Sequence, residues 1–175
     1  MRFFTLVIIY FFLTLNSYGF TTTPYNEKNL KSVFPERITP PKTSYFIFDP
    51  NHLQWAVYDI NGERVGSGKA VGGKNFCEDI KEPCRTVEGT YTVFRAGDHD
   101  CTSKTFPIDE GGGAPMPHCM FFYKGYAIHG SNNLPNKNAS HGCIRVSKKA
   151  AEWMSTYYII PGATVKVLPY ASTYL

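Results

Sequence analysis

From about residue 44 onward, the chain consists of short runs in which apolar and polar residues alternate, separated by turn-forming Gly, Pro, Asn and Asp. Alternation with a period of two is typical of β-strands that bury one face. The segments predicted to be strands are 45–49, 53–59, 64–71, 89–94, 119–123, 126–130 and 164–168. The Asn61-Gly62 pair between the second and third segments indicates a tight hairpin turn, because both residues tolerate a positive φ angle.

One stretch near the C-terminus has a helical period instead. The apolar residues predicted to share one helix face are Ala150, Trp153, Met154, Tyr157 and Tyr158. Ser147 is placed to cap the first turn, and Pro161-Gly162 ends the element. About seven strands and one helix predict a mainly β domain, a β-sandwich or barrel with one packed helix.

The N-terminus has a different pattern. One positive charge at Arg2 precedes an apolar run, and Ser17 and Gly19 place small residues two apart after it. This order is typical of a secretory signal peptide, here 1–19. An uncleaved anchor is the weaker alternative, because a membrane span needs about 20 apolar residues. No cysteine follows the run, so lipid attachment there is excluded.

Three further segments follow the predicted signal peptide. Residues 20–43 are rich in Thr, Pro and Lys and have no sustained period, which predicts an N-terminal extension or linker. Residues 44–170 are expected to form one folded domain, and 171–175 a C-terminal tail.

The composition, 43% hydrophobic and 18% charged among 175 residues, excludes a disordered, collagenous or coiled-coil chain. The formal charge is +4 and falls to +3 without Arg2, and the scattered Lys and Arg residues form no basic stripe. We therefore expect no nucleic-acid partner, and no stable membrane insertion after signal cleavage. Export implies an oxidising compartment, where five cysteines leave one thiol without a disulfide partner.

The segment Ser140-His141-Gly142-Cys143-Ile144-Arg145-Val146 and the upstream His129-Gly130-Ser131 place two histidines around one cysteine. A thiol is a poor nucleophile while protonated, and a nearby imidazole that accepts its proton raises the thiolate fraction. The glycine before the cysteine allows backbone amides to approach a substrate carbonyl, as an oxyanion hole requires. The pattern favours acyl transfer by a cysteine.

If 143–146 is extended, Cys143 and Arg145 share one face, and Ile144 and Val146 point into the core. The side chain of His141 falls on the same face as the thiol, where it either orients the thiol or braces the loop; bracing is favoured. The remaining histidines His52 and His99 lie in turn-like contexts and are expected to be exposed.

Residues 128–131 and 140–145 closely resemble the signature of the L,D-transpeptidase catalytic domain, the YkuD-type fold of bacterial cell walls. Other parts of the chain agree with this resemblance, which covers 45–168. They are the strand entry at 85–93, with Val87 where the family usually has Pro, Met116-Pro117 ahead of the strand pair, and 161–165 after the helix. Two features depart from the family: the ten-residue loop between His129 and Ser140 is short, and the cysteine-bearing insertions are not part of its pattern.

The resemblance implies a role for each residue of the signature. Cys143 is the nucleophile and His129 the general base, with its ring oriented by a carbonyl near Gly130 or Ser131. The backbone amides of His141, Gly142 and Cys143 are the oxyanion-hole candidates, and Ser140 bonds to the loop backbone. Arg145 holds a substrate carboxylate, with a structural ion pair as the alternative. The further substrate-binding candidates are Ser131, Met116 and His118.

The resemblance also implies the reaction. Cys143 attacks the carbonyl of the third-position diamino acid of a peptidoglycan tetrapeptide stem and releases D-alanine, and the thioester passes to an acceptor. An amine of another stem gives a 3-to-3 cross-link, a lysine of an envelope lipoprotein gives an anchored protein, and water makes the enzyme a carboxypeptidase. No cofactor or metal is required. The expected location is the periplasm or cell wall, after secretion across the inner membrane.

Two rival interpretations remain. A metal-binding module would draw on His118, Cys119, His129, His141 and Cys143, but these positions lack the compact Cys-x-x-Cys pairs that metal sites favour. A catalytically idle wall-binding domain of the same fold is the other.

With Cys143 assigned to chemistry, four cysteines remain, and they allow three pairings. We favour Cys77 with Cys84 and Cys101 with Cys119, each bridge contributing about 2 to 4 kcal/mol. The second bridge is expected to pin the glycine loop 111–113 beside the site.

Overall fold

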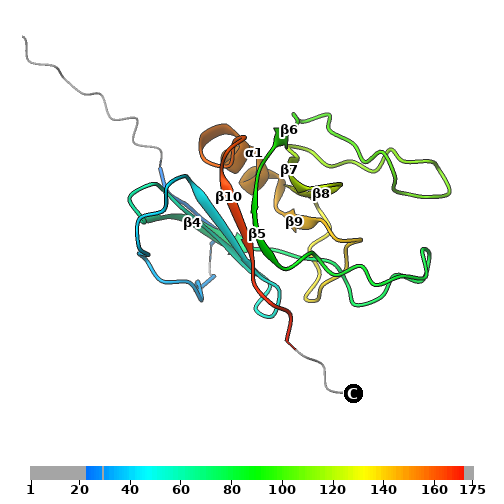
Figure 1. Ribbon diagram of the computed structural model, residues 1–175, viewed down its shortest axis with the longest axis horizontal. Coiled ribbons are helices and arrows are strands. Elements are labelled where there is room, and N and C mark those ends of the chain that lie inside the picture. The colour runs from blue at the N-terminus through cyan, green and yellow to red at the C-terminus, as the bar shows by residue number, and fades with distance from the viewer. Residues whose placement is uncertain (1–22, 29, 172–175) are drawn as a thin grey trace, which may run out of the picture.

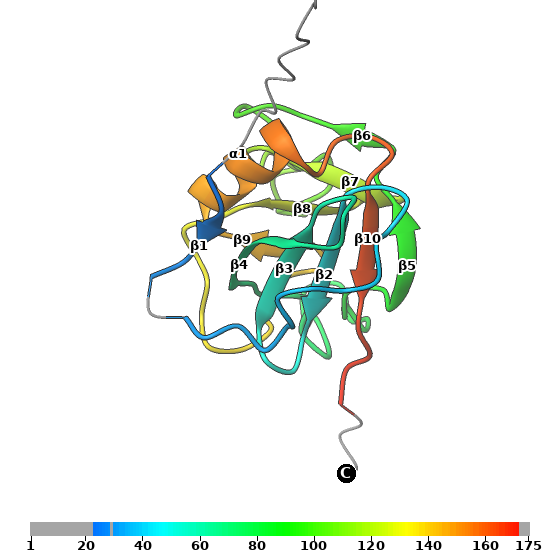
Figure 2. The same ribbon diagram turned by 90° about the vertical axis from the view of Figure 1, so that its left-hand side faces the viewer.

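Two β-sheets form the frame of the molecule (Figures 1 and 2). The computed structural model describes residues 23–28 and 30–171. The six-stranded sheet has the order β1 (Tyr25–Asn26), β4 (Arg64–Lys69), β3 (Gln54–Tyr58), β2 (Tyr45–Asp49), β10 (Thr164–Val167) and β5 (Gly89–Thr92). The four-stranded sheet has the order β6 (Arg95–Ala96), β7 (Met120–Tyr123), β8 (Tyr126–Gly130) and β9 (Ile144–Val146). This confirms the mainly β prediction.

The two sheets pack face to face, and β2 shows the alternation that the sequence predicts. On β2, Phe46 and Phe48 are fully buried, and the flanking Tyr45 and Ile47 are not. The four-stranded sheet supplies the opposite side of the core with Met120, Phe122, Ile128, Ile144 and Val146. Burial of large apolar side chains on both inner faces is the main stabilising contribution, at about 25 cal/mol per Å² of apolar surface removed from water.

The helix α1 (Lys148–Tyr157) begins at Ser147, whose side chain accepts a hydrogen bond from the amide of Ala150. Its buried side chains, Ala150, Ala151 and Met154, belong to the main core, and the helix contacts β8 (Figure 2). Tyr157, expected on the same face, is 48% exposed. The expectation was wrong there because the buried stripe covers only the first two turns of the helix.

Described residues of the N-terminal extension lie on the domain surface and contact it at several points. β1 pairs in parallel with β4, although residues 20–43 have no strand pattern. The Tyr25 ring packs against Trp55 and Trp153, and its hydroxyl lies 3.1 Å from Ser147 Oγ at the helix N-cap. The predicted signal peptide, 1–19, lies outside the described residues. Within the described residues, no helix is long and apolar enough to cross a membrane.

Two disulfide-closed loops extend from the same side of the sheets (Figure 1). The first loop is closed by Cys77–Cys84 and the second by Cys101–Cys119, the pairing favoured from the sequence. Cys143 is the free cysteine. The first loop comprises residues 77–84 and the second loop residues 101–119.

Candidate active site

The register of β8 and β9 brings the two halves of the signature together. The strands are parallel, with Ile128 opposite Ile144 and His129 opposite Arg145. Residues directly opposite one another point to the same face of a sheet, and residues two apart on one strand do so as well. His129, Arg145 and Cys143 therefore share the outer face, while Ile144 and Val146 are buried in the core as expected.

This outer face is the floor of a cleft of about 660 Å³. The signature residues Cys143, His129, Arg145, His141, Ser140 and Ser131 all line it, together with Met116. His118 does not: its backbone has a φ angle of 56°, and its amide donates to the carbonyl of Asp98. The glycines at 111–113, expected beside the site, also lie outside the cleft lining. Residues 102–106 and 114–116 of the second loop line the cleft instead.

His129 is buried and held in one tautomer. Its Nδ1 lies 3.0 Å from the carbonyl oxygen of Gly130. A carbonyl only accepts hydrogen bonds, so Nδ1 carries the proton and Nε2 keeps its lone pair. Burial lowers the pKa of His129 to about 4; the bond to Gly130 opposes this shift, and the charge of Arg145 adds to it. The imidazole is therefore neutral near pH 7 and able to accept a proton.

Cys143 is partly exposed to the cleft and packs against Met116, Phe121 and Ala127. Burial raises the pKa of its thiol, although the Ala127 amide and the charge of Arg145 act in the opposite direction. The thiol lies 3.8 Å from the carbonyl oxygen of Gly125. A raised pKa keeps the thiol protonated at rest, so its reactivity requires a base.

The loop that carries the thiol is fixed by Ser140. Its hydroxyl donates to the carbonyl of Cys143 (2.6 Å) and accepts from the amide of Gly142 (3.0 Å). Gly142 has a φ angle of 119°, and a Cβ there would lie 2.4 Å from the Tyr126 ring. Only glycine therefore fits this turn without displacing Tyr126. Because its amide is already used by Ser140, Gly142 is the least suited of the three expected oxyanion donors.

Backbone pairing on the far side of β9 holds the same loop. Val71 and Arg145 exchange both of their backbone hydrogen bonds, and the amides of Ala139 and Ser140 both donate to the carbonyl of Gly72. The signature segment thus lies between β8 and residues 71–74, with its backbone fixed from both sides.

His141 contacts both disulfide-closed loops. Its Nε2 lies 2.7 Å from Asp79 Oδ2 in the first loop, and its ring stacks on Phe106 of the second loop with centroids 4.4 Å apart. Burial acts to raise the pKa of Asp79, but the hydrogen bond and charge of His141 outweigh it and lower the pKa. These contacts support the bracing role. Sequence reasoning missed Asp79 and Phe106, because neither lies near the signature in the chain.

Two alternatives for these residues are weakened. Cys77, Asp79 and His141 have ligand atoms within 4.8 Å of one another, but the sulfur of Cys77 is in a disulfide and is not a thiolate ligand. The rival metal set drawn from the sequence loses Cys119 for the same reason.

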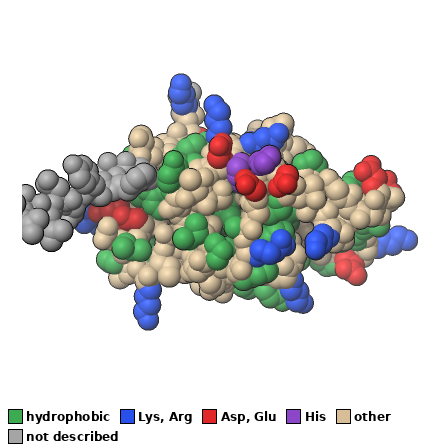
Figure 3. Space-filling model, turned by 90° about the horizontal axis from the view of Figure 1, so that it is seen from above, with side chains coloured by type: hydrophobic (Ala, Val, Ile, Leu, Met, Phe, Trp, Pro, Cys, Tyr) green, Lys and Arg blue, Asp and Glu red, His purple; other side chains and the backbone are tan. Residues whose placement is uncertain are grey.

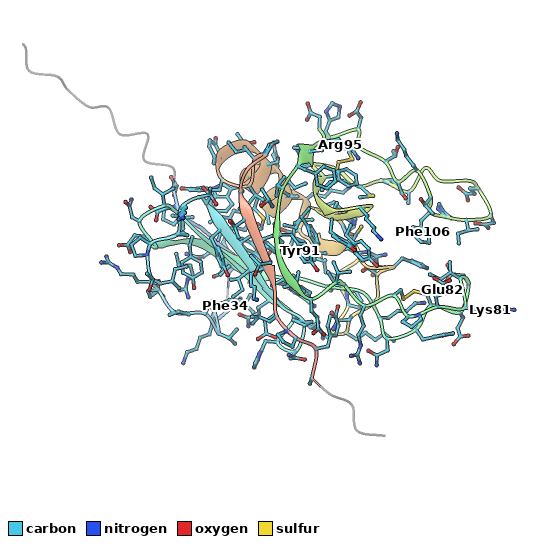
Figure 4. All side chains as sticks on the ribbon, viewed as in Figure 1. Phe34, Lys81, Glu82, Tyr91, Arg95 and Phe106 are labelled. Carbon is cyan, nitrogen blue, oxygen red and sulfur yellow. A yellow bond between two sulfur atoms is a disulfide. The ribbon has the colours of Figure 1, made fainter. Side chains whose placement is uncertain are left out.

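Positive charge gathers at the cleft. Arg145 is half-buried, which lowers its pKa, and no described carboxylate forms a salt bridge with it. Arg95, Lys104 and Lys124 also line the cleft, and Arg95 lies over the Phe121 ring. Figure 4 shows Arg95 and Phe106 on the cleft side of the molecule. On the face in Figure 3, Lys and Arg side chains are otherwise dispersed, without a basic stripe.

Several solved structures that are similar to this chain are L,D-transpeptidases. One from Xylanimonas cellulosilytica is 23% identical (TM-score 0.64) and covers 77% of this chain and 64% of that chain. One from Mycobacterium smegmatis is 22% identical (TM-score 0.58) and covers 72% of this chain and 58% of that chain. L,D-transpeptidase 3 from Mycobacterium tuberculosis, solved with a faropenem-derived adduct, is 20% identical (TM-score 0.60). It covers 73% of this chain and 60% of that chain. At these identities the likeness shows the fold, and this chain spans less than two thirds of the length of each of the three.

Among curated proteins there is no significant match. A family model described as the L,D-transpeptidase catalytic domain matches residues 43–167, most of the chain and the whole of the cleft. The chain therefore belongs to the YkuD family of L,D-transpeptidase catalytic domains.

Proposed function

We propose that this chain is an L,D-transpeptidase that acts on peptidoglycan stem peptides, with Cys143 as nucleophile and His129 as general base. The observation that carries the proposal is that a partly exposed thiol with a raised pKa and a buried neutral imidazole line the same cleft. His129 donates through Nδ1 to Gly130, so its Nε2 is the nitrogen that accepts the thiol proton.

The acylation step follows from these roles. As His129 takes the proton, the sulfur of Cys143 attacks the carbonyl carbon of the third-position diamino acid of a tetrapeptide stem. The oxyanion that forms is held by the backbone amides of His141 and Cys143, each such donor contributing about 3 kcal/mol in acyl-transfer enzymes. The protonated His129 then gives its proton to the leaving nitrogen, the C–N bond breaks, and D-alanine departs.

Deacylation reverses the proton transfers. An amine attacks the thioester, His129 accepts a proton from it, and the C–S bond breaks to restore the thiol of Cys143. The amine of a second stem yields a 3-to-3 cross-link, and a lipoprotein lysine yields an anchored protein. Water in place of the amine yields a trimmed tripeptide. The chain's own groups suffice for these steps, without a cofactor.

Arg145 is proposed to hold a carboxylate of the stem. A half-buried guanidinium without a described counter-ion is unfavourable, so a ligand that supplies the carboxylate gains paired, charge-assisted hydrogen bonds. Arg95, Lys104 and Lys124 add positive charge along the same cleft. A peptide with several free carboxylates fits this lining better than a neutral one.

Export to the periplasm or cell wall fits the same substrate. The two disulfides are typical of an oxidising compartment, and peptidoglycan lies outside the inner membrane.

The proposal is tested by incubating the purified protein with tetrapeptide muropeptides and analysing the products by mass. Dimers with a 3-to-3 link indicate a transpeptidase, tripeptides a carboxypeptidase, and exchange with an added D-amino acid an acyl-enzyme open to amines. No product of any kind indicates an idle wall-binding domain and overturns the proposal.

A second measurement locates the acyl group. The M. tuberculosis relative was solved with a faropenem-derived adduct, so a carbapenem or penem is a suitable probe. We expect an intact-mass adduct on the wild-type protein and none on Cys143→Ala. The absence of a wild-type adduct, or an equal adduct on the variant, contradicts the assignment of Cys143.

A further inference from the structure

The two disulfide-closed loops form separate walls of the cleft. The first loop contributes Ile80, Glu82 and Pro83, and the second contributes 102–106 and 114–116. The second loop is ordered internally, since Ser103 donates to Ala114 and Ala114 donates to Phe106 through their backbones, each at 2.9 Å. Among the hydrogen bonds, ion pairs and ring contacts of the described residues, none runs directly from one loop to the other.

His141 is the residue through which these walls meet. Its Nε2 bonds to Asp79 of the first loop at 2.7 Å, and its ring stacks on Phe106 of the second loop. It lies two residues before Cys143, in the loop fixed by Ser140. His141 therefore links both walls to the segment that carries the thiol, in addition to the packing of Met116 of the second loop against Cys143. Figure 4 shows Phe106 on the upper and Glu82 on the lower of the two loops that extend to the right of the molecule.

The contact with Asp79 also limits what His141 does chemically. A carboxylate only accepts hydrogen bonds, so Nε2 of His141 carries a proton directed at Asp79 and is not free to take one from the thiol. The Asp79 side chain is 48% exposed. A half-exposed hydrogen bond between side chains adds little to global stability, so its contribution lies in geometry.

We propose that Asp79 and Phe106 are positioning residues that act through His141 to fix the two cleft walls relative to Cys143. Resting on the proposed function, this predicts that they govern how tightly the stem peptide binds along the cleft, and not the proton transfer at the thiol. Both lie in the two disulfide-closed loops, so the brace ties these loops to the segment that carries the thiol.

The test compares Asp79→Ala and Phe106→Ala with matched controls in the same loops. Glu78→Ala removes an exposed acid of the first loop, and Ile108→Ala removes an exposed apolar side chain of the second. For each variant we would measure kcat and KM on a tetrapeptide stem, and the rate of Cys143 alkylation by iodoacetamide as a function of pH. The melting temperature and a count of one free thiol check that each variant is folded.

Asp79→Ala and Phe106→Ala are each expected to raise KM about five- to tenfold with kcat changed less than about twofold. The pH profile of alkylation stays that of the wild type, and both controls leave all of these values unchanged. Because the two residues act through one side chain, the double variant is expected to lose no more than His141→Ala does, well short of the product of the single effects.

Two results overturn the inference. A fall in kcat with a shifted alkylation profile in Asp79→Ala assigns His141 to proton transfer. Unchanged KM in both variants shows that the walls keep their places without the brace. Wild-type protein that turns over no stem peptide is a different failure, because it overturns the proposed function itself.

Discussion

The two faces of β8 and β9 are formed by alternating residues of the same strands, and one face is apolar whereas the other carries the reactive side chains. The inner face carries Ile128, Ile144 and Val146, all fully buried against the six-stranded sheet. The outer face carries His129, Cys143 and Arg145, which line the cleft. Since successive side chains of a strand point to opposite faces, one short segment serves both the core and the site.

This division implies that stability and chemistry are separable at single-residue resolution. Packing on the inner face fixes the position of the backbone of 143–146, and the backbone in turn determines where the outer side chains lie. Substitutions on the inner face should therefore lower the free energy of unfolding, and those on the outer face should impair catalysis or substrate binding while the protein remains folded.

Cys143→Ala is expected to have the largest effect on activity and almost none on stability. Loss of the nucleophile should lower turnover of stem peptide at least about 1,000-fold, since no thioester forms. The side chain is partly exposed and Ala retains its Cβ, so the melting temperature should change by less than about 3 °C. Product mass analysis and thermal unfolding of the same sample check both parts. A collapsed melting temperature would show that the outer face also supports the core.

Ile144→Ala tests the inner face one residue away. Removing most of a fully buried side chain leaves a cavity between the sheets and should lower the free energy of unfolding by about 3 to 4 kcal/mol. Urea unfolding with the disulfides intact measures this change, with Arg145→Gln as the outer-face control, which should lose less than about 1 kcal/mol. If the control loses as much as Ile144→Ala, the two faces are not separable.

The same contrast explains how much of the molecule could be predicted from the sequence. The strands around the core were predicted to within a few residues because short apolar runs bounded by turn-forming residues mark buried strands, as 45–49 and 126–130 illustrate. The two-residue strands β1 and β6 were missed, because two residues carry no period. β1 is held by the packing of Tyr25 on Trp55 and Trp153, which are distant in sequence.

The site divides in the same way. The signature predicted that Cys143 and Arg145 share one face, because strand geometry requires it. The roles of Asp79 and Phe106 could not be predicted from the sequence, since their contacts with His141 span 62 and 35 residues of chain and depend on how two disulfide-closed loops fold. His118 was expected to line the cleft because it lies beside Met116 in the sequence. It lies outside the cleft lining, where its backbone has a positive φ angle and its amide donates to the carbonyl of Asp98.

His129 provides a pH test of the outer face. Its pKa is about 4 in the folded protein, against about 6.5 for an unperturbed histidine. Between these values the unfolded chain binds a proton that the folded protein does not, so the free energy of unfolding falls as the pH drops from 6.5 towards 4. Above pH 6.5 the full contribution, on the order of 3 kcal/mol, is present.

The measurement is urea unfolding of the wild type and His129→Gln at several pH values from 4 to 8. Carboxylates that titrate at low pH affect both proteins alike, so the difference between the two curves isolates His129. The difference should change across pH 4 to 6.5 and be constant above it. Parallel curves throughout that window would mean that the imidazole is not buried as a neutral base.

Arg145 should give the smallest of these effects, and one confined to binding. Arg145→Gln is expected to raise KM about tenfold for a stem with free carboxylates, the loss of a paired charge-assisted contact, while kcat stays near the wild-type value. A stem in which those carboxylates are amidated is the matched substrate: it should bind the wild type about tenfold more weakly and be indifferent to the substitution, so the two losses do not add. Arg145→Lys keeps the charge but not the planar pair of donors, so its KM should lie between those of the wild type and Arg145→Gln. If Arg145→Gln impairs both stems equally, Arg145 acts on the loop that carries Cys143 and not on the substrate, and the outer face then contains a structural residue among its chemical ones.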